Sequence, residues 1–249
     1  MFKISKRYQD IFDEYIYKGE STPFTLGTLL VFVLCFLLLI IATFTQFNIS
    51  HPWLNYEEGQ GFVYAIKTIT YNPQFPIIIF ITYLLHKSYS MLVYILYILC
   101  GFFVYPIFAF GGGLQYVQNY FFGYLLGFFF AILIAGILFK NNNTIKARIL
   151  GAVFGILSIH VTGFIYCIFL AIFNAIDFNI IGPVFYVVTI ERIVYDILFA
   201  ILILLIAPYI KNVLWVFMRP AIPRQKSKNA YKRNKVVGND VYEHRQNND

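Results

Sequence analysis

The stretch that decides the fold class is "LGTLLVFVLCFLLLIIATFTQ", Leu26 to Gln46, which contains no charged residue. A helix needs about 20 mostly apolar residues to cross the hydrocarbon core of a bilayer, so this run is long enough for one span. The whole chain has the same character, because 59% of its 249 residues are hydrophobic and 12% are charged. A typical soluble domain has roughly 25% charged residues. The sequence therefore predicts a polytopic membrane protein.

Five further apolar blocks bring the number of predicted spans to six. They cover about residues 71–88, 90–110, 120–139, 149–173 and 187–210. The block at 71–88 is short, which predicts a broken or partly buried helix. Before it we expect a polar loop that contains Trp53, Glu57, Glu58 and Lys67. The predicted fold class is all-α, with a bundle of six transmembrane helices over residues 23–213.

The two ends of the chain differ from this bundle. Residues 1–22 alternate apolar and charged side chains at helical spacing, which predicts an amphipathic segment. It would lie on the membrane surface, on a partner subunit or on the end of the bundle itself. Residues 214–249 form a basic tail, because eight of the 19 Lys and Arg residues lie between Arg219 and Arg245. The tail has no apolar periodicity, so we expect it to be disordered and not to bind nucleic acid.

The distribution of Lys and Arg predicts the orientation in the cell membrane. Short cytoplasmic flanks of membrane proteins are rich in these residues. If the N-terminus is cytoplasmic, the outer side holds only Lys67 and Arg192, and the inner flanks before the tail hold Lys3, Lys6, Arg7, Lys18, Lys87, Lys140, Lys146 and Arg148. We therefore expect a multi-pass protein of the plasma membrane with both termini cytoplasmic.

Charged groups near the outer end of the last span are candidates for a site. Ionisable residues within a span are costly and usually functional. Arg192 and Asp196 are four residues apart and share a helix face, whereas Glu191 points elsewhere. The pair is either an intrahelical ion pair that lets the helix end enter the membrane, or a polar clamp for a ligand that enters from outside. A polar stretch predicted at the same depth favours the clamp.

That stretch is "FAFGGGLQYVQNYFFGYLLGF", Phe108 to Phe128, between the third and fourth spans. It has three consecutive glycines, followed by amide side chains and aromatic rings. A tight turn would need fewer glycines and fewer polar side chains, since one glycine already supplies a positive φ. The stretch therefore has more than a tight turn needs, and the distribution of Lys and Arg predicts that it faces the outer side, level with Arg192 and Asp196.

His160 lies inside the fifth span. The sequence has no second His or Cys at ligand spacing, so we expect no metal site. The imidazole either bonds a neighbouring carbonyl, or lines or supports a pocket. Ser158 lies nearby without a G-x-S-x-G motif, and the chain has no phosphate-binding loop. We therefore expect no enzyme activity and no cofactor, and any ATP hydrolysis would need another subunit.

The segment "VYPIFAFGGGLQYVQNYFFGYLLGFFFAILIAG" resembles the signature region of the BioY family, the biotin-specific S-components of energy-coupling-factor (ECF) transporters. "YNPQFP", "IHVTGFIY" and "DILFAILILLIA" resemble its second, fifth and sixth helices. The resemblance implies a six-helix bundle that captures biotin from outside and works with a T-component and ATPase subunits. It also implies that Asp196 hydrogen-bonds the ureido ring of biotin, and that Gly111 to Gly113 and their neighbours form part of the pocket wall. Phe199 stands where the family has a lysine. We expect Arg192, one turn before Asp196, to supply the positive charge of that lysine.

The predicted function is biotin uptake across the cytoplasmic membrane as an S-component. Two alternatives stay open: an S-component or small carrier for a different vitamin, and a non-transport membrane protein with a polar ligand pocket. The expected partners are biotin, the T-component, the ATPase subunits and membrane lipid. The predicted ligand-binding residues are Gly111, Gly112, Gly113, Gln115, Asn119, Tyr124, His160, Arg192 and Asp196.

Overall fold

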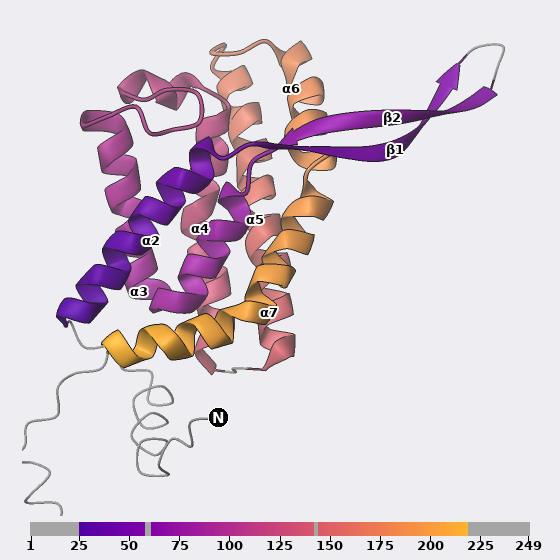
Figure 1. Ribbon diagram of the computed structural model, residues 1–249. Helices are drawn as coiled ribbons and strands as arrows, with labels where there is room; N and C mark the ends of the chain where they lie inside the picture. The colour runs from indigo at the N-terminus through magenta and orange to yellow at the C-terminus, as the bar shows by residue number, and fades with distance from the viewer. Residues whose placement is uncertain (1–24, 58–60, 142–143, 219–249) are drawn as a thin grey trace, which may run out of the picture.

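The protein is a bundle of long helices with a two-stranded β-hairpin that projects from one end (Figure 1). The computed structural model describes residues 25–57, 61–141 and 144–218. In chain order the elements are α2 (Leu26–Phe44), β1 (Phe47–Glu57), β2 (Gly61–Tyr71), α3 (Gln74–Phe103), the short 3₁₀ helix η1 (Leu114–Gln118), α4 (Phe121–Asn141), α5 (Ile145–Ile172), α6 (Phe178–Phe185), the π-helical turn η2 (Tyr186–Ile190) and α7 (Ile193–Met218).

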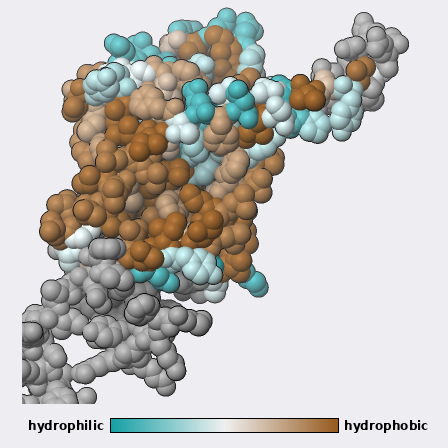
Figure 2. Space-filling model, viewed as in Figure 1, coloured by the Kyte–Doolittle hydropathy of each residue, from teal (hydrophilic) through white to brown (hydrophobic). Residues whose placement is uncertain are grey.

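Within the part of the chain that the structure describes, five helical segments are long and apolar enough to cross a membrane: Leu26–Phe44, Gln74–Phe103, Phe121–Lys140, Ile145–Ile172 and Phe178–Leu214. The flank of the bundle is covered by apolar side chains, and polar side chains gather at its two ends (Figure 2). The prediction of a helical membrane protein is confirmed. The amphipathic segment predicted for residues 1–22 lies outside the described residues, as does the tail beyond Met218, where α7 ends.

Helix α3 contains both the second and the third predicted span. At His86 the backbone takes φ 62° and ψ 167°, which is not helical. The side chain of Gln74 donates a 3.0 Å hydrogen bond to the hydroxyl of Tyr97, 23 residues later. In a straight helix these residues would lie about 35 Å apart. The chain therefore folds back at His86 into two antiparallel arms, 74–85 and 87–103, and the first arm is short, as predicted.

The segment before α3 corrects the prediction of a polar loop. Phe47–Glu57 and Gly61–Tyr71 pair as an antiparallel hairpin, in which Phe47 is opposite Tyr71 and Glu57 is opposite Gly61. The second strand, "FVYAIKTITY", is rich in aromatic and β-branched residues, which favour strands. Among the described residues this hairpin is the departure from the all-α prediction.

Helices α4 and α5 approach closely because both carry glycines at their contact. A Cβ atom on Gly127 would lie 2.7 Å from the Ile159 Cα atom, and one on Gly163 would lie 2.5 Å from the ring of Tyr124. Small residues at such positions allow helices in a membrane to gain packing contacts. This packing fixes the relative position of Tyr124 on α4 and the neighbouring residues of α5.

Helix α7 crosses the bundle and then bends at its far end (Figure 1). Pro208 lies inside α7, and a proline removes one backbone hydrogen bond and kinks a helix. The bent end meets the start of α2, where the Thr25 hydroxyl donates a 3.0 Å hydrogen bond to the carbonyl of Met218. The last helix thereby closes the bundle against the first.

Candidate functional site

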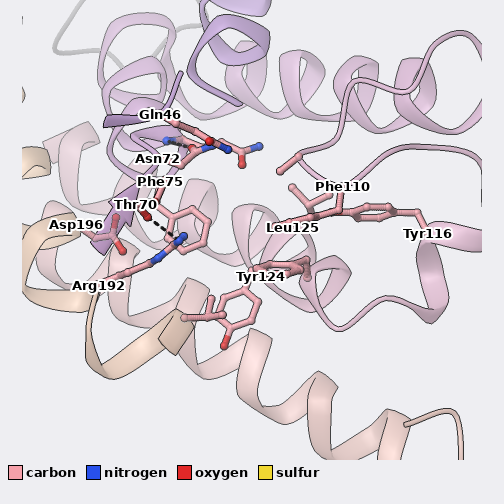
Figure 3. A pocket seen from close by; sticks show the side chains of 14 residues that line it. Gln46, Thr70, Asn72, Phe75, Phe110, Tyr116, Tyr124, Leu125, Arg192 and Asp196 are labelled. Carbon is pink, nitrogen blue, oxygen red and sulfur yellow. Dashed lines mark hydrogen bonds between the residues drawn. The ribbon is translucent and has the colours of Figure 1, made fainter. Parts of the chain in front are cut away.

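A pocket lies at the hairpin end of the bundle, between the hairpin, α3, η1, α4 and α7 (Figure 3). It is open to solvent on one side, and the space between its walls and across this open mouth is about 680 Å³. Polar side chains lie on one side and aromatic rings on the other. The lining residues are Gln46, Thr70, Asn72, Gln74, Phe75, Ala109, Phe110, Tyr116, Phe121, Tyr124, Leu125, Val188, Arg192 and Asp196.

Asp196 is the buried acid of the polar side. It is 1% exposed and accepts hydrogen bonds on both carboxylate oxygens. The Tyr71 hydroxyl donates to Oδ1 at 2.7 Å, and Nε2 of His160 lies 3.1 Å from Oδ2. Burial and the Asp196 carboxylate raise the pKa of the Tyr71 phenol, so Tyr71 remains a donor. These bonds satisfy a carboxylate that would otherwise be costly to bury.

The hydrogen bonds continue behind the pocket from His160 to Tyr124. The Thr189 hydroxyl lies 3.3 Å from Nδ1 of His160 and 3.1 Å from the Tyr124 hydroxyl. Thr189 belongs to the wide turn η2, where the Glu191 amide donates to the carbonyl of Tyr186 five residues earlier. Such π-turns often occur at functional sites. A continuous chain of five side chains therefore joins β2, α7, α5, η2 and α4.

Arg192 lines the same pocket but bonds the hairpin. Its Nη2 donates to the carbonyl of Thr70 at 2.9 Å (Figure 3). No ion pair joins Arg192 to Asp196, both of which the structure describes, so the alternative of an intrahelical ion pair is not realised. The neighbouring Glu191 instead pairs with Lys67 on β2. The hydrogen bond to Glu191 raises the pKa of Lys67, which keeps the lysine charged at neutral pH.

The other side of the pocket is aromatic. The ring of Phe75 stacks parallel to Tyr124, with centroids 6.1 Å apart, and meets His160 edge-on at 5.5 Å. Phe110 stacks on Phe121 with centroids 4.2 Å apart. This side offers an apolar surface to a ligand.

The glycine stretch supports this aromatic side from behind. Gly111 and Gly113 have φ values of 120° and 82°, which glycine adopts without strain. The Gly113 amide donates to the carbonyl of Gly101 at 2.9 Å, and a Cβ on Gly112 would lie 2.5 Å from the Pro106 Cα. The glycines therefore let the loop pack against the end of α3.

Three of the predicted site residues line the pocket: Tyr124, Arg192 and Asp196. His160 lies behind Asp196 and bonds it. Gly111, Gly112 and Gly113 are outside the lining. So are Gln115, which is exposed, and Asn119, whose side chain caps α4 by accepting from the Phe121 amide at 2.9 Å. The loop contributes its rings to the pocket and not its glycines or amides.

The sequence analysis missed the residues where the hairpin enters α3. The side-chain oxygen of Asn72 accepts a 3.0 Å hydrogen bond from the backbone N–H of Gln74, and the side-chain nitrogen of Asn72 donates to the carbonyl of Thr43. Asn72 therefore stabilises the turn that leads into α3. Gln74 and Phe75 follow it in the pocket wall. The motif "YNPQFP" contained the signal, because two amides beside prolines at the start of an apolar helix need partners. Thr70 and Gln46 had no comparable signal, since only the hairpin pairing brings them together.

The arrangement offers hydrogen bonds and an apolar surface. Arg192 and the amides of Gln74 and Asn72 supply donors, and Asp196 supplies a carboxylate acceptor. Within the residues that the structure describes, no three His, Cys, Asp or Glu side chains are placed to hold a metal ion. The geometry suits a neutral or anionic small molecule with a polar ring and an apolar body.

Comparison with known proteins places the chain in a family. The model of the BioY family matches residues 61–215. No curated protein sequence matches. The fold is similar to the crystal structure of an S-component for biotin from an ECF-type ABC transporter, with a TM-score of 0.56 and 17% sequence identity, over 79% of this chain and 100% of that one. Because the family model covers more than half of its length, including α3 to α7 and the strand β2, this chain belongs to the BioY family.

Proposed function

We propose that this protein takes up biotin across the cytoplasmic membrane as the substrate-binding S-component of an ECF-type transporter. One observation carries the proposal. The pocket of a BioY-family chain is walled on one side by Asp196, a buried carboxylate held by two hydrogen bonds. A neutral cyclic urea with N–H groups is a natural partner for such an acceptor.

The remaining pocket chemistry also fits biotin. Its bicyclic ring has an apolar thioether part, which would pack against Phe75 and Tyr124. Its side chain ends in a carboxylate, which needs a cation or several donors. Arg192 is the cation in the lining, and it takes the place of the positive charge absent at Phe199. Phe199 instead packs on Tyr71 with ring centroids 5.1 Å apart.

The proposal changes the roles that were predicted for the glycines and amides of the loop between α3 and α4. Gly111, Gly112 and Gly113 would act through the loop that presents Phe110 and Tyr116 to the pocket. Gln115 and Asn119 would contact the ligand only if this loop moves when biotin binds. The protein performs no covalent chemistry in this proposal, and the energy for release would come from ATPase subunits through a T-component.

The orientation is part of the same proposal. With both termini cytoplasmic, the pocket opens to the outside. Lys87, next to the α3 turn, and Lys140, at the end of α4, would then lie on the cytoplasmic side, which agrees with the positive-inside rule.

The proposal is tested by ligand selectivity. Purified protein in lipid nanodiscs should bind labelled biotin, and unlabelled biotin should displace it while thiamine, riboflavin and pantothenate do not. Displacement of the label by one of these other vitamins, with weak or no competition by biotin, would favour an S-component for that vitamin. Pull-down of a T-component by the co-expressed chain would test the ECF partnership.

A further inference from the structure

The outer half of the β-hairpin extends sideways past the bundle (Figure 1). Lys67 on β2 pairs with Glu191, and the ring of His51 on β1 meets Tyr195 with centroids 5.9 Å apart. His51 and Lys67 are opposite each other in the strand register, so they mark where the hairpin crosses the end of the last helix. Beyond Lys67 the strand continues to Gly61, roughly 20 Å at 3.3 Å per residue. Because a two-stranded hairpin alone is only marginally stable in water, this half needs a surface to pack on.

The hairpin has two different faces, because exposure alternates along β2. Ile69 and Tyr71 belong to the inner face and are buried against the bundle. The alternate residues belong to the outer face, and all four are exposed: Tyr64, Ile66, Thr68 and Thr70. The outer face is therefore the one that is open to a partner.

The part of the outer face that lies next to the bundle is polar. The Ser50 hydroxyl lies 2.9 Å from the Thr68 hydroxyl, and the Thr70 hydroxyl donates to the side-chain oxygen of Asn48 at 3.2 Å. Thr70 also lines the pocket. These cross-strand pairs suit a surface in water at the mouth of the pocket.

The same face becomes apolar where the hairpin passes the side of the bundle. Pro52 is opposite Ile66 in the register, and Tyr64 follows on the same face. Ile66 is 80% exposed and Tyr64 is 71% exposed. The change from hydroxyl pairs to apolar residues occurs beyond Lys67, and apolar side chains gain free energy when they leave water. The exposed apolar residues therefore lie where another surface must cover them.

The lipid-facing side of the bundle reaches the same place. Exposed apolar residues recur at a spacing of four along η2 and α7: Ile190, Val194, Leu198 and Leu202. Residues at this spacing lie on one side of a helix, and in a membrane bundle such a side meets lipid. Glu191, next to Ile190, holds the hairpin through Lys67. The hairpin is thus anchored at the edge of a lipid-facing surface and extends sideways from it.

We propose that the outer half of the hairpin, residues 52–57 and 61–66, lies on the membrane leaflet at the pocket side, with Tyr64 and Ile66 among the lipid headgroups. Tyrosine is enriched at membrane interfaces, because its ring is apolar and its hydroxyl is polar. Glu57 is the one charged residue in the sequence of these two segments. The hairpin therefore binds the interface through apolar contact, without attraction to anionic lipid, and its attachment is insensitive to salt.

The test uses nitroxide spin labels on single cysteines in phosphatidylcholine vesicles. Oxygen, which concentrates in lipid, and a water-soluble nickel complex are compared as collision partners. Thr68→Cys is the matched control, because Thr68 lies on the same face but next to the bundle. Labels at Tyr64→Cys and Ile66→Cys should collide with nickel several-fold less often than the label at Thr68→Cys, at low and at high salt. Cys35 and Cys167 are buried and Cys100 is partly buried, so labelling of the unsubstituted protein gives the background.

A second substitution shows whether apolar contact holds the hairpin on the lipid. With the label at Tyr64→Cys, Ile66→Asp should increase nickel collisions, and Ile66→Leu should not. Equal nickel access at positions 64, 66 and 68, or no effect of Ile66→Asp, would overturn the inference. Spin–spin broadening that disappears on dilution with unlabelled protein would also overturn it, because a second copy of the chain would then cover this face. Biotin is absent from the experiment, so the result does not depend on the proposed function.

Discussion

The hydroxyl of Tyr71, at the end of the hairpin, donates a 2.7 Å hydrogen bond to the carboxylate of Asp196 in α7, 125 residues later in the chain. Tyr71 is fully buried and Asp196 is 1% exposed. This bond makes the hairpin part of the pocket and not only an appendage of the bundle. It connects the element that the sequence analysis mistook for a loop to the acid that the sequence analysis identified.

Removal of that hydroxyl should weaken biotin binding. A hydrogen bond to a charged group contributes about 1.5–3 kcal/mol, so Tyr71→Phe should reduce affinity by roughly ten- to a hundredfold. The measurement is equilibrium binding of labelled biotin. Tyr64→Phe is the matched control, since Tyr64 lies on the same strand, is 71% exposed and should have no effect. Equal affinity of Tyr71→Phe and the unsubstituted protein would show that this bond does not position Asp196.

The Lys67–Glu191 pair should anchor the hairpin through charge. Lys67→Glu would place two carboxylates together, and Lys67→Glu combined with Glu191→Lys should restore attraction. Hydrogen exchange in the hairpin should accelerate in the single variant and recover in the double variant. Lys140→Glu, at the end of α4, is the control for a change in net charge. Similar exchange in the single and double variants would assign the anchoring to the Arg192–Thr70 and Tyr71–Asp196 bonds instead.

The same pair has a defined pH dependence. The pKa of Lys67 is raised, with the hydrogen bond to Glu191 as the largest cause. The contribution of the Lys67–Glu191 pair to the stability of the hairpin is therefore complete at neutral pH, and it is lost as the pH rises through the raised pKa of Lys67. The protection factors of the hairpin amides, which are corrected for the base catalysis of exchange, should fall on the alkaline side in the unsubstituted protein and should not change there in Lys67→Met.

Gly127 should be needed for the packing of α4 on α5. An added Cβ would lie 2.7 Å from the Ile159 Cα and 2.9 Å from its carbonyl oxygen, and this backbone cannot move independently. Overpacking of this kind costs about 1–3 kcal/mol, so Gly127→Ala should lower the thermal unfolding temperature in detergent. Gly182→Ala is the control, because a Cβ there meets nothing within 4 Å. An unchanged unfolding temperature for Gly127→Ala would contradict the close approach of the two helices.

The orientation can be checked with single cysteines. Gly182→Cys should react with a membrane-impermeant thiol reagent in intact cells, while Lys87→Cys and Lys140→Cys should react only after the membrane is opened. The native Cys35 and Cys167 are buried and Cys100 is partly buried, so the unsubstituted protein gives the background. Labelling in the reverse order would place the termini and the pocket mouth on the opposite sides.

The helices and the central acid could be predicted because each has a local signal. Continuous apolar runs mark the spans, and Asp196 stands out as a charge within such a run. The turn near His86 was predicted as the boundary between the separate spans at 71–88 and 90–110. These signals depend on residues near one another in the sequence.

The hairpin and the partners of Asp196 could not be predicted in the same way. The alternation in "FVYAIKTITY" is visible, but the charges around Glu57 led us to interpret the segment as a loop. Tyr71 and His160 reach Asp196, and Thr189 reaches His160, only through the tertiary packing of four elements. The glycine stretch was expected to touch the ligand because it resembles the signature loop of the BioY family, whereas its glycines serve the close packing against Gly101 and Pro106.

The central proposal is that Asp196 is the acceptor for biotin in this pocket, and equilibrium binding of labelled biotin to purified protein and to Asp196→Asn tests it most directly. Asparagine keeps the shape of the side chain but removes the charge. The unsubstituted protein should bind at or below micromolar concentration, and Asp196→Asn should bind roughly ten- to a hundredfold more weakly, as expected for the loss of a charged acceptor. No binding by the unsubstituted protein at micromolar biotin would contradict the function, and equal affinity of the two proteins would contradict the site.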